Sequence, residues 1–66
     1  MKIFLTRDFS KKEKQFPEGT KIEEVLKAEG ASKQTIVILL NGGVAHPSTV
    51  LREGDELELV GVIYGG

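Results

Sequence analysis

Short apolar and alternating segments along the chain predict five β-strands. Residues 2–6 are rich in β-branched and apolar side chains at their centre, which favours a first strand. Residues 12–16 alternate charge with little to bury before Pro17, as is typical of an edge strand, and we expect Phe16 to anchor it in the core. Residues 36–40 form an unbroken apolar run, too short for a helix, that ends at an Asn-Gly-Gly turn. This run predicts a central strand.

The last predicted strand has the clearest alternation in the chain. In residues 56–60, Leu57 and Leu59 point one way, whereas Glu56 and Glu58 point the other. Residues 44–46 favour a brief returning strand that is stopped by Pro47.

A capping box predicts where the single helix begins. The Thr20 hydroxyl can accept a hydrogen bond from an early helix amide while Glu23 reaches back to the Thr20 amide. Gly30 follows the helical pattern at a position where a left-handed C-terminal cap is expected. Charged residues occupy the helix face that we expect to be exposed to solvent. Three apolar residues at three- and four-residue spacing line the opposite face: Ile22, Val25 and Leu26.

This order of elements predicts an α+β fold of the β-grasp type, a mixed sheet of four to five strands with one helix packed across one face. The first and last strands must meet in the middle of the sheet, in parallel, because they carry the apolar side chains that can face the helix. These are Ile3, Leu5, Leu57 and Leu59. We expect residues 1–60 to form the domain and residues 61–66 to form an exposed C-terminal tail.

One helix covers only one face of such a sheet, so some apolar side chains are left on the open face. Phe4, Val60 and Val62 are out of phase with their buried neighbours, and we predict that they belong to a partner surface. Either Ile36, Ile38 and Leu40 or Val37 and Leu39 join them. The alternative is that loops and long lysine stems cover these side chains.

Composition narrows the classes of function. Sixty-six residues allow one small domain with a thin core and little room for an enclosed cleft, so we expect a carrier, binder or modifier and not an enzyme. A formal net charge of -1 gives no reason to expect nucleic acid. The chain has no cysteine, which excludes disulfides and thiolate catalysis. The lack of a long apolar run or a signal-peptide layout predicts a cytoplasmic protein without a membrane span.

Two features invite a catalytic interpretation that the sequence does not favour. His46 is the only histidine, and with no cysteine beside it we expect neither a metal ligand nor a general base. Residues 41–43 could be mistaken for a phosphate-binding loop, but no P-loop lysine or helix start follows them. We therefore predict a hairpin turn there, and neither catalytic residues nor a metal site in this chain.

The most informative segment is the end of the chain, where residues 61–66 read Gly-Val-Ile-Tyr-Gly-Gly. Six extended residues could carry the terminal carboxylate roughly 20 Å from the body. Glycine has no Cβ, so a terminal glycine pair can enter a narrow cleft in another protein. A frayed terminus does not explain the apolar residues 62–64 directly before that pair.

With this tail, the chain resembles the ubiquitin-like sulfur carriers. That family includes the thiamine-biosynthesis carrier, the small subunit of molybdopterin synthase, and relatives that also act as protein modifiers. The resemblance spans the whole chain in element order. It is carried by residues 40–43 (LNGG), residues 51–60 (LREGDELELV) and the diglycine at 65–66.

The resemblance implies a reaction at Gly66. A ubiquitin-activating-type enzyme would use ATP and magnesium to adenylate the Gly66 carboxylate, and a sulfur donor would then displace AMP to leave a thiocarboxylate for a downstream synthase. Gly65 would complete the reactive end, while Tyr64, Ile63 and Val62 would dock along the enzyme clefts. The chain itself would bind no cofactor, and the open sheet face would supply most of the affinity for partners.

Two other functions stay open on the sequence. A covalent modifier would use Gly66 to form isopeptide bonds with lysines, so that an amine and not a persulfide attacks the adenylate. A passive β-grasp binding module would have no chemistry at its terminus. Tyr64 is bulky, and no arginine precedes the diglycine as it does in ubiquitin, which leaves the identity of the activating enzyme open.

Overall fold

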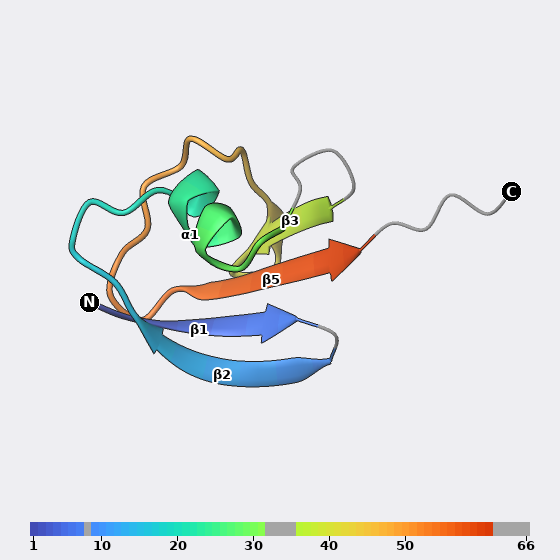
Figure 1. The fold of residues 1–66 in the computed structure, drawn as a ribbon, viewed down its shortest axis with the longest axis horizontal. Helices are drawn as coiled ribbons and strands as arrows, with labels where there is room; N and C mark the ends of the chain where they lie inside the picture. Colours follow the sequence, from blue (N-terminus) through green and yellow to red (C-terminus); the bar gives the residue numbers. More distant parts are fainter. Residues whose placement is uncertain (8, 32–35, 62–66) are drawn as a thin grey trace, which may run out of the picture.

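Five strands and one helix follow one another in the predicted order in the computed structural model, which describes residues 1–7, 9–31 and 36–61 (Figure 1). The elements are β1 (Lys2–Arg7), β2 (Ser10–Gln15), α1 (Ile22–Ala28), β3 (Ile36–Leu40), β4 (Gly43–Val44) and β5 (Glu56–Gly61).

The strands form one mixed sheet in the order β2-β1-β5-β3-β4. The two central strands, β1 and β5, run parallel, with Leu5 opposite Leu57 and Arg7 opposite Leu59. The other pairs, β1 with β2, β3 with β5 and β3 with β4, are antiparallel. The predicted β-grasp fold and its central parallel pair are therefore confirmed.

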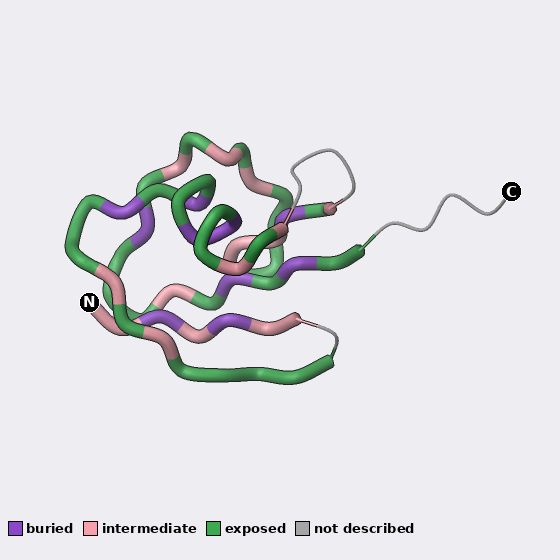
Figure 2. Tube along the Cα trace, in the orientation of Figure 1, coloured by how far each residue is buried: buried purple, intermediate pink, exposed green. Residues whose placement is uncertain are grey.

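The core lies between α1 and one face of the sheet. Figure 2 shows that buried residues gather on β1, β5 and α1. Burying an aliphatic side chain stabilises a fold by about 1.5–3 kcal/mol, so this layer supplies the main driving force for folding. Its buried apolar members are Ile3, Leu5, Ile22, Val25, Leu26, Ile38, Leu51, Leu57 and Leu59. The predicted sheet positions and helix stripe are all among them.

The predicted capping box is wrong by one residue. Lys21 is the N-cap, and its backbone amide donates a 2.8 Å hydrogen bond to the carboxylate of Glu24. The Thr20 hydroxyl instead donates a 2.6 Å bond to the carbonyl of Pro17. Because the Thr20 hydroxyl is bonded within the turn before the helix, it does not cap the helix. Glu24, and not Glu23, supplies the capping carboxylate, and Glu23 is exposed.

A neighbouring loop satisfies the first amides of the helix, which have no partner within the helix itself. The Ile22 amide donates to the Thr49 carbonyl at 3.0 Å, and the Glu23 amide donates to the Pro47 carbonyl at 2.8 Å. Leu51, at the end of the same loop, is 2% exposed and belongs to the core. The loop thus fixes the helix start through backbone bonds and one buried side chain.

The predicted glycine cap after the helix is confirmed. Gly30 follows the C-cap residue Glu29, and its φ of +69° is the left-handed conformation that glycine adopts without steric cost. The Gly30 amide donates to Lys27 and the Ala31 amide donates to Leu26, at 3.2 and 2.8 Å. These two bonds form a Schellman cap.

Some strand limits differ from the sequence prediction. β2 begins at Ser10, because Arg7 pairs directly with Ser10 and leaves only two residues for the turn. β4 is limited to Gly43–Val44, and β5 runs one residue past the predicted end to Gly61. Phe16 lies just after β2 and packs against the core, as predicted.

Candidate functional site

The register of β3 shows which apolar set faces away from the helix. Ile38 is 5% exposed and lies in the core, whereas Val37 and Val60 are cross-strand partners that are each 39% exposed. Leu39 shares the face of Val37 because side chains alternate along a strand. The open face therefore carries Val37 and Leu39, and the other set, Ile36, Ile38 and Leu40, belongs to the core side.

Phe4 occupies the open face of β1, and lysines cover it. The ammonium groups of Lys2 and Lys11 lie 6.0 and 5.3 Å from the centre of its ring, within the range of a cation–π interaction. Lys11 is also 3.0 Å from the Glu56 carboxylate, in an exposed ion pair that is worth little on its own. The alternative that lysine side chains cover the open face therefore applies to Phe4. It does not apply to Val37 and Val60, which are exposed.

Polarity changes along the open face. Val60 directly precedes Gly61, the last described residue, whereas Glu58 and Glu56 lie progressively farther back along β5. The two glutamates border a shallow depression with Thr6 and Asn41. The apolar end of the face is therefore the end nearest to the predicted tail.

The predicted docking and reactive residues of the tail, Val62, Ile63, Tyr64, Gly65 and Gly66, lie outside the described residues. Their attachment point is described: Gly61 pairs with Ile36 at the end of β5. The segment therefore begins at a central strand of the sheet, beside the exposed pair Val37 and Val60.

The two motifs that carried the resemblance within the body contact each other. Asn41, with φ at +50°, accepts a 2.9 Å bond from the Glu56 amide and donates a 3.1 Å bond to Asp55. The second Asp55 oxygen accepts from the Arg52 amide at 2.8 Å. The pairing of β3 with β4 confirms the predicted hairpin turn. The Asn41 side chain joins this turn to the start of β5 and so stabilises the fold.

His46 also takes part in a local turn. Its Nδ1 lies 2.7 Å from the Ser48 hydroxyl and accepts a 3.0 Å bond from the Ser48 amide. Among the residues that the structure describes, no three His, Cys, Asp or Glu side chains are grouped so that they could hold a metal ion. In the same residues, no helix is both long and apolar enough to cross a bilayer.

A family model described as the ThiS family matches residues 5–66, which is nearly the whole chain and includes the terminal diglycine. The chain belongs to the ThiS family. In coarse terms it is a sulfur-carrier or ubiquitin-like protein.

Solved structures share its fold. The thiamine biosynthesis protein ThiS from Geobacter metallireducens is 25% identical with a TM-score of 0.67, over 96% of this chain and 99% of that one. SAMP1 from Haloferax volcanii has a TM-score of 0.78 at 18% identity, over all of both chains. A ubiquitin-like protein from the hyperthermophilic archaea Caldiarchaeum subterraneum has a TM-score of 0.65 at 17% identity, over 98% of this chain and 100% of that one.

Proposed function

We propose that this ThiS-family chain is a sulfur carrier whose Gly66 carboxylate is adenylated and then converted to a thiocarboxylate. The observation that carries the proposal is the family match, which continues to Gly66. The attachment of the tail to a central strand supports it, because a rigid strand can aim the segment that follows. Since the 25%-identical relative is named a thiamine biosynthesis protein, we favour a synthase of the thiamine type over the molybdopterin type as acceptor.

The chemistry requires activation because an ionised carboxylate is a poor electrophile. An α-carboxyl has a pKa near 3.5 in model compounds and is therefore ionised at pH 7. In the proposed first step, a Gly66 oxygen attacks the α-phosphorus of ATP, held with magnesium by a ubiquitin-activating-type enzyme, and pyrophosphate leaves. A hydrosulfide from the sulfur donor then attacks the carbonyl carbon. The bond to AMP breaks, AMP carries away the electron pair, and the sulfur loses its proton.

The open face supplies a docking surface for the activating enzyme in this proposal. Val37 and Val60 form an exposed apolar pair next to Gly61, after which the tail follows in sequence. Covering such exposed apolar side chains with a partner is favourable. Phe4 lies on the same face, where Lys2 and Lys11 would have to move or bind with it. The enzyme would hold the body here while Val62, Ile63 and Tyr64 guide Gly65 and Gly66 into its active site.

The direct test of the first step is ATP–pyrophosphate exchange. The activating enzyme from the same genome is incubated with this chain, ATP, magnesium and labelled pyrophosphate. We expect exchange that depends on this chain and disappears when Gly66 is deleted, with the circular dichroism spectrum unchanged. Equal exchange with the deleted chain would place the chemistry elsewhere and overturn the proposal.

A further inference from the structure

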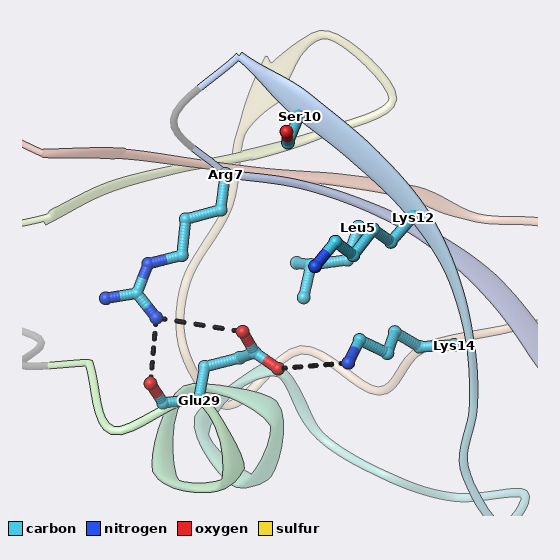
Figure 3. Close-up of a pocket in the computed structure, with 6 residues that line it drawn as sticks. All are labelled: Leu5, Arg7, Ser10, Lys12, Lys14 and Glu29. Atoms are coloured by element: carbon cyan, nitrogen blue, oxygen red, sulfur yellow. Dashed lines mark hydrogen bonds and ion pairs between the residues drawn. The ribbon is translucent and has the colours of Figure 1, made fainter.

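A basic hollow lies at the edge of the sheet, on the side that α1 covers (Figure 3). Three cations and one carboxylate line it, so it carries two net positive charges in a chain whose overall charge is -1. The buried side chain of Leu5 contributes an apolar wall. The basic hollow consists of Leu5, Arg7, Ser10, Lys12, Lys14 and Glu29.

The Glu29 carboxylate, the only one that lines the hollow, does not satisfy all the N–H donors of Arg7 and Lys14. The Nη1 of Arg7 donates to the Glu29 carbonyl at 2.8 Å but lies 3.7 Å from the Glu29 carboxylate. Lys14 is 3.8 Å from the other carboxylate oxygen. A direct charge-assisted bond is about 2.7–2.9 Å long, so these contacts are loose, and a guanidinium has further N–H donors.

Lys12 stands apart from this group. It is exposed and forms no ion pair with any residue in the described part of the chain, and Figure 3 shows it on β2 between Ser10 and Lys14. Lysines on an edge strand often serve only to deter strand pairing. That role explains Lys12 and Lys14, which lie on the edge strand β2. It does not explain why Arg7, which lies on β1, lines the same hollow.

The position of the hollow links it to the tail. Because β1 and β5 are parallel and Arg7 is opposite Leu59, Arg7 lies at the end of the sheet where β5 reaches Gly61. A protein that engages the tail would approach this end, a step that rests on the proposed function. The hollow is on the helix side, so it is a second surface distinct from the open face.

We propose that the basic hollow docks an acidic peptide segment of the protein partner that engages the tail. One carboxylate of the segment would pair with Lys12, and another would take the unused donors of Arg7 and Lys14. Charge complementarity is the basis for this choice of occupant, and it predicts a salt-sensitive contact that adds to association rate and orientation.

The test is a titration of the ¹⁵N-labelled full chain with a synthetic peptide rich in Asp and Glu, followed by NMR. We expect shifts to concentrate on the amides of the basic hollow. Lys12→Glu should weaken binding about tenfold, whereas the matched control Lys27→Glu, on the exposed face of α1, should change it by less than about twofold. Binding should weaken as salt rises from about 0.01 M to about 0.15 M.

Three results would overturn the proposal: no saturable binding, shifts centred on another surface, or an equal loss for Lys12→Glu and Lys27→Glu. The last would mean that net charge alone attracts the peptide. Lys12→Gln keeps every described contact of Glu29 and should weaken binding about threefold, so the test does not depend on tolerance of a reversed charge. The titration does not involve Gly66, so its failure leaves the adenylation proposal standing, and a failure of pyrophosphate exchange leaves the titration result standing.

Discussion

The guanidinium of Arg7 in β1 donates a 2.8 Å hydrogen bond to the backbone carbonyl of Glu29 at the C-terminal end of α1. Carbonyls at this end of a helix lack partners within the helix and carry partial negative charge. The bond therefore ties the helix end to a central strand, at the end of the sheet where β5 reaches Gly61.

Replacing Arg7 should loosen that tie. Arg7→Ala removes a charged donor from a helix carbonyl, and we expect the free energy of unfolding to fall by about 1 kcal/mol, since the side chain is partly exposed and its charge is screened. Arg7→Lys keeps the charge and should lose less. Urea denaturation of both variants measures the difference, and a stability of Arg7→Ala equal to that of the wild type would show that the bond contributes nothing.

Asn41 should contribute to stability through both its side chain and its backbone. Asn41→Ala removes the bonds to Asp55 and the Glu56 amide and places a less suited residue at a φ of +50°. We expect a loss of about 2 kcal/mol in the free energy of unfolding. Asn41→Gly restores conformational freedom and should lose about 1 kcal/mol. Equal losses in thermal unfolding would contradict a backbone contribution.

Phe9 is a site where substitution should increase stability. Its φ is +63° and its side chain is fully exposed in the turn between β1 and β2, a place where glycine or asparagine is preferred. Left-handed conformation costs a bulky residue about 1–2 kcal/mol, which the greater unfolded-state entropy of glycine offsets in part. Phe9→Gly should therefore raise the free energy of unfolding by about 0.5 kcal/mol in urea denaturation. A decrease would mean that the phenyl ring makes stabilising contacts.

The open face can be tested with two valines of similar exposure. Val60 lies on the open face at 39% exposure, and Val50 lies in the loop near the helix start at 49%. If the activating enzyme binds the open face, Val60→Glu should lower kcat/KM for pyrophosphate exchange about tenfold, a change that corresponds to about 1.4 kcal/mol. Val50→Glu should stay within about twofold. Similar losses for both variants would argue against the open face as the docking surface.

Hydrophobic patterns that extend over a whole strand or helix were sufficient to predict the fold. The alternation around Leu57, the apolar run of β3 and the helix stripe each depend on which face of an element is buried, and packing obeys that pattern. The capping signal at Thr20 failed for two reasons. A competing local turn uses the Thr20 hydroxyl, which donates to the Pro17 carbonyl three residues earlier, and a tertiary contact with the loop through Thr49 satisfies the first helix amides.

The candidate surfaces were less accessible to sequence reasoning. Leu51 follows Val50 in an apolar pair between two turns, and a pair is too short for a period to show which of the two is buried. The open side of β3 depends on its register with β5, which pairs Val37 with Val60. The basic hollow combines side chains from β1, β2 and the end of α1, including Arg7 and Glu29, which are far apart in sequence. Only the folded topology brings them together.

Gly66 is the proposed acceptor of sulfur, and intact-mass spectrometry can detect that sulfur on the chain. The full chain is incubated with its activating enzyme, ATP, magnesium and a sulfide source, beside the chain lacking Gly66. We expect that only the full chain gains the mass difference between one sulfur and one oxygen atom. An unchanged mass, with an enzyme that is active on another carrier, would contradict the claim, and ladders of this chain joined to other proteins would assign Gly66 to protein modification instead.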